Sequence, residues 1–351
     1  MFALTVLIPV YNDWEAVRPL LRDLDHAVAR LLIPARVLIV DDASTEPPDL
    51  NGFGAYRSFE AVEILHLRRN LGHQRAIAIG LFHIYERIPS EAVLIMDGDG
   101  EDHPDHIASL FEEFRRHQGT RIVFAARTKR MEGIGFRLSY ALYRWTHRAL
   151  TGIPVRVGNF SLLPWRALER LMVVSELWNH YAAAVFRAKL PFSEVPLPKG
   201  RRYAGESKMN FFALLVHGLS AIVTFGDLVS VRMLAISIGM LTLTAALIAP
   251  ALWFSQIPGG DAPAWPMILG LGVLLALVAQ AAMFATLMAF VTVGSRSGMT
   301  FLPLRDAAYF RSSVTPVFRR SEPLCARQDD DPQEHESIRG LLQNLETHVH
   351  L

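Results

Sequence analysis

The chain has 351 residues, 51% of them hydrophobic, and a formal net charge of +1. This near-neutral balance provides no global positive field, so nucleic acid is not expected as a partner. A single cysteine, Cys325, excludes an internal disulfide framework and suits a reducing compartment. Charged residues are frequent up to Arg232, nearly vanish until Arg296 and then return. We therefore expect a soluble domain joined to a membrane segment.

Short apolar runs alternate with amphipathic segments from the N-terminus to about Pro196. The apolar start has no basic leader, so we expect a buried strand there and not a secretory signal peptide. The expected strands are Leu4–Pro9, Ala35–Val40, Val62–Leu67, Ala92–Met96 and Arg121–Ala125. The expected helices are Trp14–Leu32, His73–Arg87, Pro104–His117 and Phe136–Leu150. This alternation predicts an α/β domain over residues 1–208, with a mostly parallel sheet covered by helices on both faces and a site at the carboxyl ends of its strands.

The second half of the chain predicts a membrane anchor. Residues 209–231 are typical of an interfacial amphipathic helix, and an ordinary core helix fits them equally well. Two spans, 232–257 and 265–294, contain no charged residue after Arg232, and each is long enough to cross a bilayer and form part of a transmembrane hairpin. Basic residues flank its outer ends and its connecting loop has none, so the positive-inside rule predicts a multi-pass protein of the cytoplasmic (inner) membrane with cytoplasmic soluble parts. Residues 295–351 are expected to form a cytoplasmic, partly disordered tail.

An acidic cluster follows the fourth expected strand. Asp97, Asp99 and Glu101 lie within five residues, and clustered carboxylates repel one another unless a cation lies between them. Hard oxygen ligands at a strand end suit Mg²⁺ or Mn²⁺, which also accept substrate phosphates as ligands. A solvated acidic turn is the alternative for such a short pattern. The position after a buried strand and before the helix start at Pro104 favours the metal site.

Polar residues also follow the other expected strands. Asp42 can hydrogen-bond a nucleoside or merely cap its turn, and capping is slightly favoured for it alone. Tyr11 and Asp13 follow the first strand and suit stacking on a base and gripping it. Gly72, in the segment Asn70–His73, would allow the backbone to approach a ligand closely.

In this order, the motifs resemble family 2 inverting glycosyltransferases with the GT-A fold, a Rossmann-like α/β fold. A later segment, Arg202–Lys208, resembles the R-x-x-G-x-S-K motif of the polyprenyl-phosphate (dolichol-phosphate-mannose-synthase-like) branch. The likeness covers about residues 1–230, and the paired membrane helices match bacterial members. The motifs that carry it are Pro9-Val10-Tyr11-Asn12-Asp13, Val40-Asp41-Asp42-Ala43-Ser44, Asn70-Leu71-Gly72 and Asp97-Gly98-Asp99.

The resemblance implies a role for each matching residue. The nucleotide-sugar would contact Pro9, Tyr11, Asp13, Asp42, Asn70, Gly72 and Asp97. The metal, Mg²⁺ or Mn²⁺, would be held by Asp97, Asp99 and Glu101, the last replacing the family's usual Gln. Catalysis would fall to Asp99, Arg127, Arg202, Ser207 and Lys208. The acceptor would be bound by Arg127, Arg137, Asn159, Arg202 and Lys208, with Arg137 the loosest match.

The implied reaction moves a sugar from a UDP- or GDP-sugar to polyprenyl phosphate or another lipid-linked acceptor. The metal neutralises the leaving nucleoside diphosphate, and basic side chains align the acceptor phosphate. That phosphate needs little general-base help because its second pKa is about 6. For Arg202 and Lys208, the alternative is a juxtamembrane patch that only attracts anionic membrane lipids. Assembly into a homo-oligomer is left open.

One residue departs from the family pattern. Asn159 lies in Gly-Asn-Phe-Ser-Leu where many members have Gly-Asp-Phe-Arg-Leu, and an amide is neither a base nor a metal ligand. Asn159 is compatible with an ionised acceptor, or with a family 2 transferase acting on a glycolipid or polysaccharide. A non-catalytic membrane scaffold is a third reading, which the intact carboxylates disfavour. The histidines, including His66 and His73, are expected to be solvated or to cap helices.

Overall fold

A computed structural model describes residues 3–50, 53–54, 56–127, 148–149, 151–152, 157–205, 222, 224–254, 265–295 and 301–320. These residues form two units. The first comprises the described residues of 3–127, 157–205 and 301–320, and the second those of 148–152, 222–254 and 265–295. Each unit is described by itself below.

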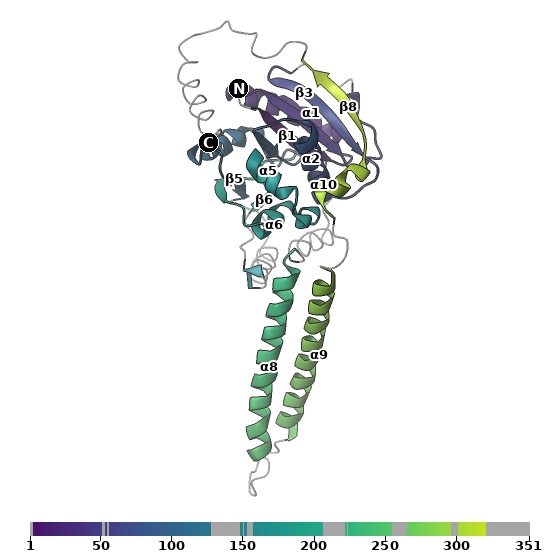
Figure 1. The fold of residues 1–351 in the computed structure, drawn as a ribbon. Helices are drawn as coiled ribbons and strands as arrows, with labels where there is room; N and C mark the ends of the chain where they lie inside the picture. Colours follow the sequence, from purple (N-terminus) through teal and green to yellow (C-terminus); the bar gives the residue numbers. More distant parts are fainter. Residues whose placement is uncertain are drawn as a thin grey trace. The chain divides into compact units, whose positions relative to one another are not determined.

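The first unit is built on a mixed sheet with the strand order β7-β5-β6-β4-β1-β2-β3-β8 (Figure 1). β1 pairs in parallel with β2 and β4, β2 with β3, and β5 with β7, while β6 and β8 join antiparallel to their neighbours. The α/β class with a mostly parallel sheet is therefore confirmed. The strands are β1 (Leu4–Val10), β2 (Ala35–Asp41), β3 (Phe59–Leu67), β4 (Ala92–Ile95), β5 (Ile122–Arg127), β6 (Val157–Pro164), β7 (Phe192–Leu197) and β8 (Arg311–Arg319).

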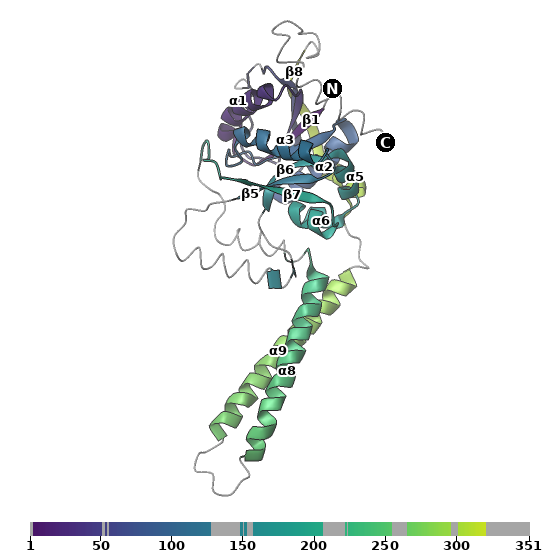
Figure 2. The ribbon, with the colours of Figure 1, turned by 90° about the vertical axis from the view of Figure 1, so that its left-hand side faces the viewer.

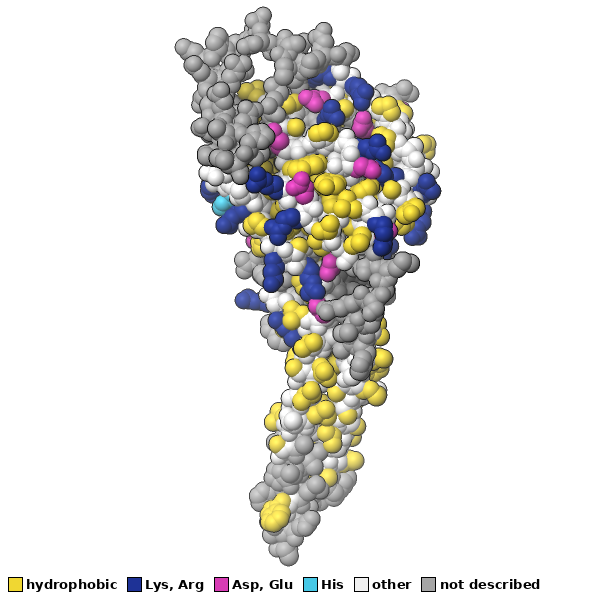
Figure 3. Space-filling model, in the orientation of Figure 1, with side chains coloured by type: hydrophobic (Ala, Val, Ile, Leu, Met, Phe, Trp, Pro, Cys, Tyr) yellow, Lys and Arg dark blue, Asp and Glu magenta, His cyan; other side chains and the backbone are white. Residues whose placement is uncertain are grey.

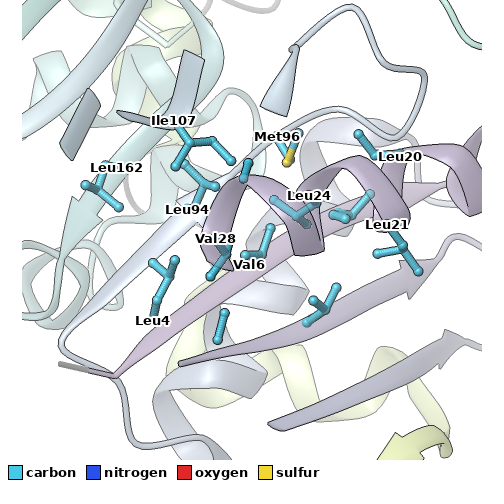
Figure 4. Close-up of a cluster of buried hydrophobic side chains, with 14 of the residues drawn as sticks. Leu4, Val6, Leu20, Leu21, Leu24, Val28, Leu94, Met96, Ile107 and Leu162 are labelled. Carbon is cyan, nitrogen blue, oxygen red and sulfur yellow. The ribbon is translucent and has the colours of Figure 1, made fainter. Parts of the chain in front are cut away.

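Helices cover both faces of this sheet because its central strands are apolar on both sides. Leu4, Val6 and Ile8 of β1 pack against α1 and α3 in one core cluster, part of which Figure 4 shows. Leu7 points to the opposite face and packs in a second cluster with α2, α5 and α6. The helical segments are α1 (Trp14–Arg30), α2 (His73–Arg87), η2 (Pro104–His106), α3 (Ile107–Arg116), α5 (Trp165–Leu171), η3 (Ser175–Trp178), α6 (Tyr181–Arg187), α10 (Pro303–Asp306) and η4 (Ala307–Phe310).

The five predicted strands all form, each within three residues of its expected ends. The predicted helix Pro104–His117 divides into η2 and α3, while Phe136–Leu150 lies almost entirely outside the described residues. β6, β7 and β8 were not among the expected strands. β6 contains Asn159 and was read only as a motif, although its last five residues are buried.

The predicted tail contains ordered structure. Within 295–351, the described residues 301–320 form α10, η4 and β8, and β8 adds to the edge of the sheet beside β3 (Figure 1). Its Pro316 is compatible with an edge strand. Proline has no backbone N–H to donate, and on the outer side of an edge strand no neighbouring strand needs that hydrogen bond. The register also shifts between Val62 and Glu63, next to the pair that Glu63 makes with Pro316. The residues from 321 onward lie outside the described part.

The second unit is a helical hairpin of α8 (Gly226–Phe254) and α9 (Trp265–Ser295), which lie side by side in both views (Figures 1 and 2). Gly226–Thr244 and Ile268–Met288 are long and apolar enough to cross a membrane, and only 17% and 11% of them is buried. The hydrophobic side chains along both helices are visible in Figure 3. Because the core helix of a soluble protein would be mostly buried, exposure on this scale favours lipid contact.

The boundaries of the hairpin differ slightly from those predicted. α8 begins at Gly226, so residues 226–231 continue into the first membrane helix and do not end a separate interfacial helix. Residues 209–221 lie outside the described part of the chain. α8 ends at Phe254 and α9 begins at Trp265, where the predicted spans end at 257 and begin at 265.

Candidate active site

The candidate site lies where the strand order reverses. From β1 the chain moves to β2 and β3 on one side, and then returns to place β4 on the other side of β1. Parallel sheets of this kind form a crevice at the carboxyl ends of such strands. The segments that follow β1, β2 and β4 therefore meet at one edge: Tyr11–Asp13, Asp42–Ser44 and Met96–Asp102.

The loops after β1 and β2 are joined by hydrogen bonds. The Asn12 N–H donates to Ser44 Oγ at 2.9 Å, and the Thr45 N–H donates to Asn12 Oδ1 at 2.8 Å. Tyr11 beside them is 39% exposed, and its aromatic ring is of the type that stacks on bases. Pro9 is buried within β1, so it can shape the strand but presents little surface to a ligand.

Asp42 connects the end of β2 to the start of α2 through hydrogen bonds. Its side chain is buried, Oδ1 accepts the Leu71 N–H at 2.7 Å, and Oδ2 accepts the Gly72 N–H at 2.8 Å. Burial raises the pKa of Asp42, although these two hydrogen bonds lower it. Gly72 has φ +87°, which favours glycine, and α2 begins at the next residue. The positive end of the α2 dipole is thereby held at this edge, next to the exposed Asn70.

The acidic turn, defined here as residues 97–102, is folded by its own carboxylates. The Asp97 N–H donates to Asp102 Oδ2 at 3.0 Å, and the Glu101 N–H donates to Asp99 Oδ1 at 2.9 Å. Burial and then the charge of Asp97 raise the pKa of Asp99, and the nearby charge of Glu101 adds to the effect. Such a turn favours an added positive charge.

The strap, defined here as residues 199–203, brings positive charge onto this turn. Lys199 Nζ lies 2.7 Å from Glu101 Oε1, and an Arg202 guanidinium nitrogen donates to Asp99 Oδ2 at 2.8 Å. A second nitrogen of Arg202 lies 3.7 Å from Asp13 Oδ2. The backbones also pair, since the Gly200 N–H donates to the Glu101 carbonyl at 2.8 Å and the Tyr203 N–H to the Asp99 carbonyl at 3.0 Å.

Two glycines allow this close approach. A Cβ on Gly200 would lie 2.8 Å and 2.9 Å from two carbonyl oxygens of the acidic turn. A Cβ on Gly100 would lie 2.1 Å from the Tyr203 ring, whose hydroxyl donates to Asp23 at 2.6 Å. Backbone atoms cannot move aside as a flexible side chain can, so position 200 requires glycine while the strap is in place.

Gly200→Ala is therefore expected to detach the strap and to lower the transfer activity that the sequence resemblance implies roughly tenfold, because Arg202 loses its fixed position. Hydrogen exchange at the amides of Gly200 and Tyr203 should rise in parallel. Gly54→Ala is the matched control, because nothing lies within 4 Å of the Cβ it would add. Unchanged exchange at both amides in Gly200→Ala would show that the strap tolerates the methyl group.

Asn159 faces His73 through an amide whose orientation is fixed. The Tyr181 N–H donates to Gln74 Oε1 at 2.8 Å, so Gln74 Nε2 must face Asn159 Oδ1, 3.0 Å away. Asn159 Nδ2 then lies 2.9 Å from His73 Nε2, which is also 3.1 Å from Asp97 Oδ1. Burial alone would lower the pKa of His73, but Asp97 and other nearby carboxylates outweigh it and raise that pKa. Position 159 thus presents N–H donors to the site, and they compete with Asp97 for His73 Nε2, because Asn159 needs the lone pair of that nitrogen and Asp97 needs its proton.

The predicted metal ligands each face a basic side chain: Asp99 faces Arg202, Glu101 faces Lys199, and Asp97 faces His73. Among the residues that the structure describes, no three acidic, His or Cys side chains are grouped as a metal site. The donor set is nevertheless hard oxygen at the end of a buried strand, which suits Mg²⁺ or Mn²⁺. These basic groups supply the positive charge that a bound cation would otherwise provide.

Several predicted residues meet at this edge, and others are not placed there. The first group comprises Tyr11, Asp13, Asp42, Asn70, Gly72, Asp97, Asp99, Glu101, Asn159 and Arg202. Arg127 is the last residue of β5, and only its backbone pairing with Leu197 is described. Arg137, Ser207 and Lys208 lie outside the described residues.

The sequence analysis missed the site roles of His73, Lys199 and Tyr203. For His73 a signal was present, because it directly follows Gly72 at the expected start of a helix. Lys199 precedes the R-x-x-G-x-S-K motif, so the motif does not include it. No local pattern pointed to Tyr203, whose contacts are with distant parts of the chain.

Comparison with known proteins agrees with this arrangement. Residues 5–170 match the family model "Glycosyl transferase family 2". An uncharacterized glycosyltransferase, YkcC of Bacillus subtilis, is 25% identical over 236 residues, which cover 63% of this chain and 68% of YkcC. The undecaprenyl-phosphate 4-deoxy-4-formamido-L-arabinose transferase of Pseudomonas aeruginosa is 27% identical, covering 74% of this chain and 75% of its own.

Other similarities are more partial. The transferase of the same description from Erwinia tasmaniensis is 26% identical, and this chain spans only 64% of its length while 60% of this chain is covered. Among solved structures, glucosyl-3-phosphoglycerate synthase from Mycobacterium tuberculosis, in complex with Mn²⁺, UDP-glucose and phosphoglyceric acid, has a TM-score of 0.46. The two chains are 15% identical, and the alignment covers 65% of this chain and 80% of the synthase chain.

The sheet with its reversed strand order, the acidic turn at that reversal and the sequence relatives together define a glycosyltransferase with a GT-A type domain. More particularly, residues 5–170 match the family model of glycosyl transferase family 2. Its named relatives include polyprenyl-phosphate sugar transferases, and two candidate transmembrane helices follow the domain.

Proposed function

We propose that this chain transfers a sugar from a nucleotide-sugar, a UDP- or GDP-sugar, to polyprenyl phosphate, with inversion and with a divalent metal. The observation that carries the proposal is the contact between the acidic turn and the strap, in which Arg202 lies 2.8 Å from Asp99. This contact joins groups suited to a metal and groups suited to a phosphate in one site. The names of the relatives support polyprenyl phosphate as the acceptor.

The donor would be bound at the three strand ends. Tyr11 would stack on the base, while Asp42 holds the α2 N-terminus toward the diphosphate. Asp97 and Asp99 would hold Mg²⁺ or Mn²⁺, with Glu101 beside them. When bound, the metal neutralises the leaving nucleoside diphosphate. Arg202 and Lys199 would then turn from these carboxylates toward phosphate oxygens.

The acceptor would be held by basic side chains and by Asn159. A phosphate monoester is largely ionised near neutral pH, so it attacks the anomeric carbon without a base. The amide of Asn159 suits this acceptor because a donor N–H stabilises an anion where a carboxylate would repel it. Arg127, Arg137, Ser207 and Lys208 are proposed as further acceptor-binding or catalytic residues on the family pattern.

The chain's connectivity supports placing the whole sheet on one side of a membrane. β7 precedes α8 in sequence, β8 follows α9, and both strands belong to the same sheet. A sheet cannot be divided by a bilayer, so a hairpin that crosses must begin and end on the same side. The basic residues Arg232 and Arg296, against a connecting loop without Lys or Arg, favour the cytoplasmic side of the inner membrane.

A nucleotide-sugar screen tests the proposal. The full chain in detergent micelles is incubated with Mn²⁺ or Mg²⁺, undecaprenyl phosphate and a panel of UDP- and GDP-sugars, and release of UDP or GDP is measured. Release that depends on both lipid and metal is the expected result. Release only with a preformed glycolipid would instead assign the glycolipid acceptor, and no release with any donor would favour a scaffold.

A further inference from the structure

The strand β8 follows the membrane hairpin in sequence. One histidine of β3, His66, connects β8 to the edge of the sheet that is proposed to bind the nucleotide. His66 lies on β3, and its Nδ1 is 2.9 Å from Asp41 Oδ2 while its Nε2 is 3.1 Å from Thr315 Oγ1. Thr315 pairs with Ile64 in the register of β3 and β8, so it lies diagonally across from His66 on the same face. The contact therefore connects residues 249 positions apart in the chain.

The chemistry of these groups fixes the direction of the hydrogen bonds. The carboxylate of Asp41 only accepts, so Nδ1 of His66 carries the proton and donates it. In the neutral imidazole, Nε2 is then an acceptor, and the Thr315 hydroxyl is free to rotate and donate to it. Asp41 is buried, with 8% of its side chain exposed, so a lost partner there is not readily replaced by water.

Asp41 in turn shapes the loop after β2, which the proposed function places beside the nucleotide. Its Oδ1 accepts the Ser44 N–H at 2.9 Å, and Ser44 Oγ accepts the Asn12 N–H at 2.9 Å. Ala43 within this loop has φ +55° and Asn12 has φ +52°. The left-handed region is unfavourable for alanine, so this loop needs contacts that hold it. Asp41 provides such a contact through Oδ1, and His66 contacts its second oxygen, Oδ2.

We propose that His66 and Thr315 are positioning residues for donor binding. Through Asp41 they keep the loop 42–46 in the form that binds the nucleotide, and so connect the strand beyond the membrane hairpin to the donor site. This inference rests on the proposed function of that edge in binding a nucleotide-sugar. Neither side chain is assigned a contact with the reacting atoms.

The test compares three variants of the full chain in detergent micelles. Thr315→Val removes the hydroxyl and keeps the shape, so the KM for the donor should rise about fivefold with kcat unchanged. Without nucleotide, the amides of Ala43 and Ser44 should exchange hydrogen faster. Thr315→Ser keeps the hydroxyl and should restore both values. Arg319→Gln is the matched control, since it removes another contact between β8 and β3, Arg319 to Glu63 at 3.7 Å, away from the site.

Two results would overturn the inference. Loop exchange in Thr315→Val equal to that of the unaltered protein would show that the histidine contact does not hold the loop. An equal change in Arg319→Gln would show a general loosening of β8. Because hydrogen exchange needs no turnover, an unaltered chain without activity toward any nucleotide-sugar would refute the proposed function alone, and the exchange of Ala43 and Ser44 would still decide the coupling.

Discussion

Asp99→Asn is expected to reduce sugar transfer about a thousandfold, equivalent to about 4 kcal/mol in the barrier. The amide keeps the shape of the side chain but loses the charge that would hold a divalent metal. The hydrogen bond from the Glu101 N–H to Oδ1 remains possible, so the acidic turn should keep its conformation. The measurement is nucleoside diphosphate release at saturating donor over a range of Mn²⁺ concentrations.

The stability of this variant separates loss of metal binding from loss of folding. Burial and the charge of Asp97 raise the pKa of Asp99, so the folded protein disfavours its ionised form and loses stability as pH rises through that pKa. An uncharged Asn removes this cost at neutral pH, and the unfolding temperature should not fall by more than a few degrees. Asp105→Asn is the control, because Asp105 is 61% exposed and pairs with Arg30. Activity in Asp99→Asn close to that of the control would refute a metal role for Asp99.

A short apolar strand followed by charge is a strong local signal, and it predicted that Asp97, Asp99 and Asp42 lie at one edge of the sheet. Such strands are buried in α/β proteins, and parallel strands bring their carboxyl ends to one edge. The roles of these three residues in binding a metal or a nucleotide-sugar rested in addition on carboxylate chemistry and on the family resemblance, and they stay predictions. The detailed role of Asp42 was less accessible, because its hydrogen bonds go to Leu71 and Gly72, about thirty residues further along.

The strand β8 could not be predicted from such local patterns. Its segment is polar at the start and contains Pro316, which are features of a loop or an edge strand alike. Its partner, β3, lies on the far side of the membrane hairpin in sequence, and local patterns carry no information about a pairing that distant. The coupling through His66 and Thr315 depends on this register and could not have been predicted from spacing.

The strap shows the same limit at the site itself. The motif around Arg202 indicated a phosphate clamp, but not that this guanidinium lies against Asp99, 103 residues away in the chain. Closure of the strap depends on Gly200 and Gly100, whose backbones lie too close to their neighbours for a side chain. Sequence spacing could identify the basic residues, but only the structure showed which carboxylates they contact.

Arg202→Ala is expected to change metal binding and sugar transfer in opposite directions. In the protein without donor, Arg202 occupies one oxygen of Asp99 and lies near Asp13, so it competes with a cation for this site. Removing it should strengthen the binding of Mn²⁺ alone roughly three- to tenfold, the scale of about 1 kcal/mol for a partly exposed ion pair. Transfer should fall about a hundredfold, because the acceptor phosphate loses a charged donor in the transition state.

The two measurements are Mn²⁺ titration by calorimetry and nucleoside diphosphate release. Arg201→Ala is the matched control, because Arg201 is the adjacent arginine and is exposed. Arg202→Lys should not restore transfer, since an ammonium group lacks the planar fork that binds phosphate through two nitrogens. Weaker binding of Mn²⁺ by Arg202→Ala would show that Arg202 supports the metal-binding form of the acidic turn, and would contradict competition between the guanidinium and a cation for Asp99.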